Sequence, residues 1–236
     1  MIEIKWAERP TGSGFHAFEW DYKNLFLQNK VDLNEGINDG DCLTLTNLVA
    51  NLKAPRPWKI LEIGSWKGGS TAIMAFAYNP DGVIYCVDTW GGSPGEWNVE
   101  VVQKYDVAYM FLRNMALMRL LDRVRMIKCT SHKASTLFPD NTFDLIFIDG
   151  DHRYEGVKQD LDDFYPKLKI GGIICGHDLN QDFWESPDMV DMVAEKDGAN
   201  NHAGVSKTVY EKFGRDYKIN REKGCTIWWK EKDANL

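Results

Sequence analysis

Short apolar runs alternate with longer segments of mixed polarity through most of the chain, beginning at Trp58. Apolar runs of this length, bounded by Gly, Pro, Asn or Asp, predict strands. The expected strands are residues 59–63, 83–88, 124–128, 144–149 and 172–176. The intervening segments predict helices at residues 69–78, 99–121, 133–137 and 154–168. Alternation of apolar strands with helices predicts an α/β fold, in which a mostly parallel sheet has helices on both faces.

The C-terminal part departs from this alternation. After an expected helix at residues 205–213, two strands at residues 217–219 and 225–229 are separated only by a turn at residues 220–224. Because so short a connection joins antiparallel strands, we expect a C-terminal antiparallel hairpin at or near one edge of the sheet.

The main domain is expected to span residues 39–236 and to begin with a helix at residues 39–52. Residues 1–38 contain too many Trp and Phe side chains for a disordered tail. We expect this N-terminal extension to form a lid, or a contact within a homo-oligomer. Residues 179–203 form a long polar loop insertion, and loops of that length are usually functional or mobile.

Polar side chains gather where the expected strands end. Glu62 lies within the end of the first strand, and Asp88 and Asp149 end the second and fourth. His177 and Asp178 follow the fifth. In a mostly parallel sheet the carboxyl ends share one edge, and ligands bind outside it. We therefore expect the binding site at this edge.

A glycine-rich turn between Glu62 and Thr71 joins the first strand to the following helix. It lacks the Lys-Ser/Thr pair of a phosphate-binding loop and the G-x-G-x-x-G of a dinucleotide fingerprint. A carboxylate here would repel a pyrophosphate and attract a cationic or hydroxyl-bearing ligand. A turn needed only for tight strand–helix packing is the alternative. Asp88, placed to accept hydrogen bonds from a ribose diol, favours a nucleoside.

Composition limits the partners. A formal net charge of −7 argues against nucleic acid as the main partner, because phosphate binding requires a positive surface. The first residues lack the apolar core of a signal peptide, and no apolar run approaches the ~18 residues of a membrane span. The five cysteines include no closely spaced pair, as expected in a reducing compartment. We expect a cytoplasmic protein whose partner is a small molecule, neither nucleic acid nor membrane.

Four segments together resemble the class I S-adenosylmethionine-dependent methyltransferases, namely residues 61–71, 87–90, 143–152 and 171–178. The resemblance covers about residues 39–230 and is closest to the small-molecule O-methyltransferases of the catechol, macrocin and cephalosporin-hydroxylase-like groups. It implies a Rossmann-like, seven-stranded sheet whose last strand inserts antiparallel, which agrees with the hairpin expected above.

The resemblance also implies S-adenosylmethionine as the cofactor. It places Glu62 and Gly64 beside the methionine part, Asp88 at the ribose hydroxyls and Trp90 over the adenine. Ser131 and His132, after the third strand, are expected at the adenine edge, although Ser131 could instead cap the next helix. The other expected cofactor contacts are Ser65, Gly68, Ser70, Thr71, Thr89 and Asp149.

At the other side of the site the resemblance implies a divalent metal, Mg or Mn, held by Asp149, His177 and Asp178. His177 departs from the family pattern, which has an acid there, and histidine suits Mn, Fe, Co or Zn better than Mg. The alternatives are a different metal, a His177 that is not a ligand, or no metal. His152 matches the catalytic lysine of the catechol group and Asp151 the base of the macrocin group. Both are expected catalytic residues, and a helix-start role is the alternative for His152.

The expected function is O-methylation of a small hydroxylated molecule, such as a sugar or a natural product, assisted by a metal. Two alternatives remain open. One is a methyltransferase fold with other metal-dependent, hydroxylase-like chemistry, and the other is a cofactor-binding protein without turnover. A nicotinamide oxidoreductase is disfavoured by the missing G-x-G-x-x-G.

Overall fold

A computed structural model of the chain describes residues 36–55, 57–77, 82–93, 96, 98–180, 202–220 and 224–234. The expected lid at residues 1–38 and the loop insertion at residues 179–203 therefore fall almost entirely outside the described residues. Among the helices within these ranges, none is long and apolar enough to cross a membrane.

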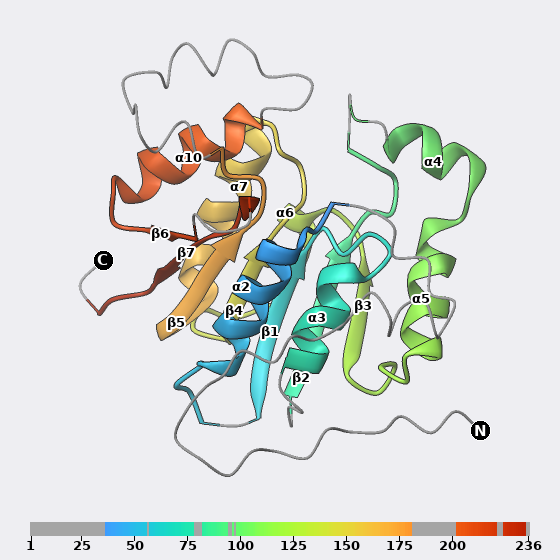
Figure 1. Cartoon of the computed structure of the whole chain (residues 1–236), viewed down its shortest axis with the longest axis horizontal. Helices are drawn as coiled ribbons and strands as arrows, with labels where there is room; N and C mark the ends of the chain where they lie inside the picture. Colours follow the sequence, from blue (N-terminus) through green and yellow to red (C-terminus); the bar gives the residue numbers. More distant parts are fainter. Residues whose placement is uncertain are drawn as a thin grey trace.

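Seven strands form one sheet in the order β3-β2-β1-β4-β5-β7-β6 (Figure 1). The strands are β1 (Trp58–Ile63), β2 (Gly82–Asp88), β3 (Val124–Lys128), β4 (Phe143–Ile148), β5 (Leu168–Gly176), β6 (Lys218–Ile219) and β7 (Trp228–Glu231). The first five pair in parallel, and β7 runs antiparallel to both β5 and β6. The predicted Rossmann-like, seven-stranded sheet with a C-terminal antiparallel hairpin is confirmed.

Helices cover both faces of the sheet because its central strands are apolar on both sides. In β4, Leu145 and Phe147 pack in the same cluster as α2, α3 and α5, whereas Ile146 and Ile148 pack with α7 and α10. Figure 1 shows α7 and α10 side by side. The helices are α2 (Asp39–Ala50), α3 (Gly69–Ala77), α4 (Asn98–Lys104), α5 (Val107–Leu117), α6 (Ser131–Ser135), α7 (Tyr154–Phe164) and α10 (Ala203–Phe213).

The single helix expected over residues 99–121 is wrong, because the chain forms two helices, α4 and α5, with a break at Tyr105 and Asp106. The Asp106 carboxylate accepts a hydrogen bond from the N–H of Tyr109, 3.0 Å away, and so caps the start of α5. Apolar residues on both sides of the break, including Val102 and Val107, pack into the same core cluster, so the periodicity does not reveal it.

Element boundaries in the second half of the chain also differ from expectation. The helix expected over residues 154–168 ends at Phe164, where the 3₁₀ turn η1 (Tyr165–Lys167) with its Pro166 follows. A proline cannot continue the hydrogen-bonding pattern of a helix. β5 then begins at Leu168, earlier than residue 172.

The last strand begins at Trp228, later than residue 225, because the preceding residues bind to α2 instead of β5. The N–H of Thr226 donates to Asp41 Oδ1 at 2.7 Å, and Cys225 Sγ lies 3.3 Å from Thr44 Oγ1. Asp41 also accepts from the N–H of Asn38 and so completes the capping box of α2. One buried carboxylate thereby joins α2 to the segment that leads into β7.

Candidate active site

A cavity of about 570 Å³ opens at the carboxyl ends of β1, β2 and β4. Of the residues expected at the site, its lining includes Gly64, Ser65, Ser70, Asp88, Thr89, Ser131, Asp149, Asp151, His152, His177 and Asp178. Five expected residues lie outside the lining, namely Glu62, Gly68, Thr71, Trp90 and His132. The strand order explains the position, because β1 and β4 are the neighbours at which the chain changes direction across the sheet.

Gly64 lines the cavity just after β1 ends. Its φ is +86°, and a Cβ added there would lie only 1.8 Å from the carbonyl oxygen of Asp149. The strand ends are held together at this point, since the N–H of Gly64 donates to Val87 O and the N–H of Asp149 donates to Ile63 O. Only glycine allows this close approach.

Glu62 lies beneath the turn and does not face the cavity. Its carboxylate is fully buried and accepts hydrogen bonds from the hydroxyls of Ser70 and Thr71, at the start of α3. Burial raises the pKa of Glu62 to about 7, although these hydrogen bonds act to lower it. Glu62 therefore fixes α3 against β1, and its contribution to the cavity is to hold the glycine turn in place.

Asp88 projects from the end of β2 into the cavity. Its Oδ2 accepts from the N–H of Trp66 at 2.8 Å, and its Oδ1 accepts from the N–H of Trp90 at 2.6 Å. Each carboxylate oxygen can accept a further hydrogen bond, so a diol could bind here. The Trp90 indole is turned away, since it donates to the carbonyl of Trp66 and packs on Phe111 in the core.

Of the two residues expected to reach the cavity from the loop after β3, Ser131 lines it and His132 does not. Thr130, not Ser131, caps α6 by accepting from the N–H of Lys133. Ser131 lines the cavity and hydrogen-bonds the buried carboxyl group of Asp160 on α7. His132 points outward, with its Nδ1 2.7 Å from Asp163 Oδ2 and most of its side chain exposed.

A cluster of carboxylates and imidazoles lines the cavity beside the ends of β4 and β5. His177 Nδ1 lies 3.2 Å from Asp178 Oδ2 and 3.7 Å from Asp149 Oδ1. His177 Nε2 is 3.0 Å from Oδ2 of Asp41, which is completely buried in α2. Asp178 has a φ of +62°, an unusual conformation for a residue other than glycine, and such strain gathers at functional sites.

His152 lies at the centre of this cluster. Its Nε2 is 3.3 Å from Asp149 Oδ1 and 3.1 Å from Asp178 Oδ2, and its Nδ1 is 2.8 Å from Glu96 Oε1. Burial alone would lower the pKa of His152, but the hydrogen bonds to Asp149 and Glu96 and the charge of Asp178 outweigh it and raise the pKa to about 10. Among these carboxylates, with no cation bound, His152 carries a proton at neutral pH.

Asp151 also lines the cavity, but its carboxylate is paired with its neighbour in sequence. Arg153 Nη2 is 2.6 Å from Asp151 Oδ2, and Arg153 Nε is 3.0 Å from Asp151 Oδ1. Partial burial acts to raise the pKa of Asp151, but the hydrogen bonds and charge of Arg153 outweigh it and lower the pKa. The pairing makes Asp151 a weaker proton acceptor than a free carboxylate.

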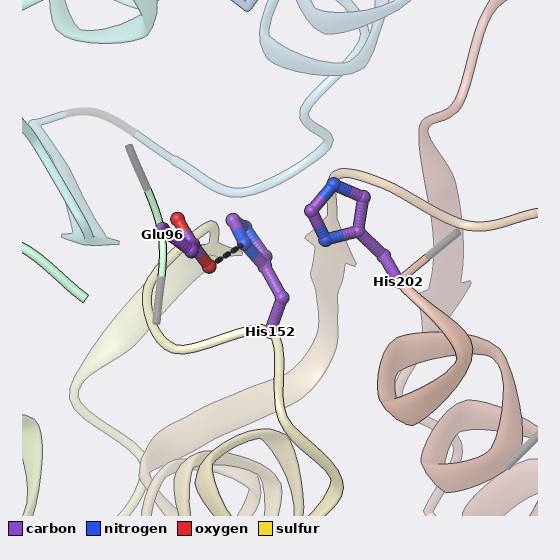
Figure 2. A group of neighbouring side chains, drawn as sticks. All are labelled: Glu96, His152 and His202. Carbon is purple, nitrogen blue, oxygen red and sulfur yellow. Dashed lines mark hydrogen bonds and ion pairs between the residues drawn. The ribbon is translucent and has the colours of Figure 1, made fainter. Parts of the chain in front are cut away.

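Four residues of this region were not expected from the sequence, namely Asp41, Glu96, Asp160 and His202. Figure 2 shows His152 lying between Glu96 and His202. The rings of His152 and His202 are 4.4 Å apart and nearly perpendicular. Asp160 would have been suggested only by its place on the apolar side of α7, three residues after Val157 and four before Phe164. Glu96 and His202 come from segments that show no motif of their own, and Asp41 belongs to the capping box of α2, which indicates a helix start and not a ligand site.

The sheet order, the glycine turn after β1 and the carboxylates after β2 and β4 together define the fold of class I S-adenosylmethionine-dependent methyltransferases. A family model described as a methyltransferase domain matches residues 61–179, about half of the chain. The chain belongs to this methyltransferase family.

Several solved structures share the fold. An O-methyltransferase from Bacillus cereus in complex with SAH is 17% identical, with a TM-score of 0.56, covering 88% of this chain and 86% of that one. The O-methyltransferase NovP is 18% identical, with a TM-score of 0.56, covering 81% and 79%. The cofactor-bound Rv0187 from MTB is 17% identical, with a TM-score of 0.60, covering 88% and 87%. Identities this low establish the fold alone.

A curated relative, the uncharacterized protein y4gI of Sinorhizobium fredii, is 28% identical over 130 residues. The aligned segment is 53% of this chain but 13% of that protein, so the chain spans a small part of the length of its relative.

Proposed function

We propose that the protein is an S-adenosylmethionine-dependent O-methyltransferase that acts on a small hydroxylated molecule, such as a sugar or a natural product, with the help of a divalent metal. The observation that carries this proposal is that one cavity joins the Gly64–Asp88 end to the carboxylate–histidine end. A methyl donor and an acceptor bound in one cavity can react directly. The Bacillus cereus neighbour, solved with SAH, supports the choice of donor.

The donor end fits a sulfonium nucleoside. Gly64 leaves room beside the strand ends, and Asp88 keeps lone pairs for two ribose hydroxyls. The cofactor supplies a methyl group that is already activated on a positively charged sulfur. The residues of this end therefore need only to bind and orient it.

The acceptor end fits a divalent cation. Asp149, His177 and Asp178 present one ligand atom each, and these atoms lie within 4.8 Å of one another. A bound cation would lower the pKa of an acceptor hydroxyl. Asp151 and His152 border the same space. The charge of the cation would favour loss of the proton that His152 otherwise carries, so both residues are placed to receive the proton of the acceptor. The net charge of −7 favours a small-molecule acceptor over nucleic acid.

Two variants test the division of the cavity. Asp88→Ala should weaken SAH binding by about 10- to 100-fold, as expected for losing hydrogen bonds to a charged group. Asp149→Ala should abolish turnover and leave SAH binding nearly unchanged. Calorimetry measures the binding, and SAH released from S-adenosylmethionine over a panel of hydroxylated compounds measures the turnover.

The wild-type protein decides between this proposal and the alternatives. Absence of SAH binding by the wild type would contradict the proposal outright. Metal-dependent oxidation of an acceptor without SAH formation would assign hydroxylase-like chemistry instead. Full activity of Asp149→Ala with an authentic acceptor would show that the metal and base site is wrongly placed.

A further inference from the structure

His152 and His177 each direct one ring nitrogen toward the same two carboxylates. His152 Nε2 is 3.3 Å from Asp149 Oδ1 and 3.1 Å from Asp178 Oδ2. His177 Nδ1 is 3.7 Å and 3.2 Å from the same two oxygens. Two ring nitrogens, from the turns after β4 and β5, therefore lie within 3.7 Å of the same two carboxylate oxygens.

The second nitrogen of each ring is held by a further carboxylate. His177 Nε2 is 3.0 Å from Asp41 Oδ2, and His152 Nδ1 is 2.8 Å from Glu96 Oε1. A neutral imidazole that donates its N–H to a carboxylate presents the lone pair of the other nitrogen in the opposite direction. Carboxylate–histidine pairs of this kind orient the histidine ligands of metal ions and raise their basicity. Here the arrangement occurs twice, on opposite sides of the Asp149–Asp178 pair.

The donor atoms of this cluster distinguish between metals. Imidazole nitrogen suits Zn, Fe, Co and related ions, whereas Mg²⁺ prefers oxygen and retains several waters. We propose that Asp149, His152, His177 and Asp178 form a two-nitrogen, two-oxygen site for a first-row transition-metal ion, with Asp41 and Glu96 orienting the two histidines. This assignment rests on the proposed metal-assisted function and narrows the metal to a class other than Mg²⁺. It also makes His152 a ligand and leaves proton acceptance to Asp151.

A different grouping, with Glu96, His152 and His202 around one ion, is geometrically near. In that grouping Glu96 would be a ligand, whereas its hydrogen bond to His152 Nδ1 in Figure 2 suits an outer carboxylate that orients the ring. His202 Nε2 is also 3.9 Å from Asp178 Oδ1 and contacts His152 with its ring, so it borders the four-ligand site.

The test measures metal binding by the full chain without donor or acceptor. Metal-free protein is titrated with Co²⁺, Zn²⁺ and Mg²⁺ by calorimetry, and the visible spectrum of the Co²⁺ form reports nitrogen ligation. Co²⁺ and Zn²⁺ should bind at least about 100-fold more tightly than Mg²⁺. Glu96→Gln should weaken Co²⁺ binding by about 10- to 100-fold, as for other outer-shell carboxylates, and His152→Asn should weaken it further.

His132→Asn is the matched control, because His132 also pairs with a carboxylate but lies outside the cavity. It should bind Co²⁺ as the wild type does. His177→Asn leaves the buried Asp41 without its partner and could fail to fold, so His152→Asn, at a less buried position, carries the test.

Equal affinity for Mg²⁺ and Co²⁺ would overturn the proposal. So would a His152→Asn variant that binds Co²⁺ with the affinity and spectrum of the wild type. Metal binding is measured without donor or acceptor, so a failure of this proposal is distinguishable from a failure of the proposed methyl transfer. The latter would appear as absent SAH binding.

Discussion

Three carboxyl groups at or beneath the cavity wall lie where burial favours the protonated form. Burial raises the pKa of Glu62 and of Asp160 to about 7, and it also raises the pKa of Asp88. Hydroxyl or backbone N–H groups act to lower these pKa values without cancelling the effect of burial. These residues illustrate that a carboxyl group can be retained in a core when hydrogen bonds satisfy it.

Asp160 makes stability depend on pH. Its pKa rises from an ordinary 3.8 to about 7 in the folded state, so the folded chain binds the extra proton between these values. Stability should therefore fall as pH rises from about 4 to about 7, with the full loss present above that range. Asp160→Asn removes this loss and should be more stable than the wild type at pH 8, by up to about 4 kcal/mol, and equally stable near pH 4. Urea unfolding across this pH range measures the difference.

The exposed Asp122→Asn serves as the control, because it removes a carboxylate without relieving any burial. Parallel pH profiles for Asp160→Asn and the wild type would show that Asp160 does not titrate in this range.

At the level of single residues, the sequence indicated cavity-lining side chains where strand ends supply them. Asp88, Asp149 and Asp178 were identifiable because parallel strands bring their carboxyl ends to one edge. Asp41 and Glu96 were not identifiable, because each reaches the site from another segment, and the capping-box position of Asp41 indicates only the start of a helix. Glu62 was predicted to contact the cofactor, but its hydrogen bonds hold it beneath the turn.

At the level of elements, the strands were predictable because each is an apolar run between turn residues. The break between α4 and α5 was not, because apolar positions continue through it and a single Asp106 provides the only stop signal. An isolated Asp in an amphipathic segment is compatible with both a helix interior and a cap, although its preference is for the cap.

The Asp106 cap can be tested directly. Asp106→Ala removes the acceptor for the N–H of Tyr109 and should lower the free energy of unfolding by about 1 kcal/mol. Asp106→Ser keeps an acceptor and should recover most of the loss. Urea unfolding at neutral pH measures both. A loss in Asp106→Ser equal to that in Asp106→Ala would assign the effect to charge and not to the cap.

At the level of the whole molecule, α2 ties the two ends of the domain together through one side chain. Asp41 is completely buried and binds the N–H of Asn38, the N–H of Thr226 and the Nε2 of His177. Burial acts to raise its pKa, but these hydrogen bonds and the charge of His177 outweigh it and lower the pKa. The sheet order alone would not have revealed this link, because α2 precedes the first strand.

Asp41→Asn should therefore destabilise the entire domain. Removing one member of a buried charged pair typically costs about 3–5 kcal/mol, because the partner remains buried. Chemical unfolding of Asp41→Asn should show a single transition at a lower denaturant concentration than the wild type. The control variant Asp122→Asn should unfold at the same concentration as the wild type. A loss of less than about 1 kcal/mol, the range of an exposed ion pair, would show that the link contributes little to stability.

The hydrogen bond from the Thr226 amide to Asp41 gives the site a native spectroscopic reporter. Asp41 Oδ1 accepts the amide hydrogen bond of Thr226, and Asp41 Oδ2 faces His177. A change in how tightly His177 is held should therefore change the strength of the Thr226 hydrogen bond. Deuterium uptake by this one amide, followed by NMR or mass spectrometry, should slow when an ion fills the site. Occupancy of the centre could then be read from the backbone without a substrate, a label or a coloured metal.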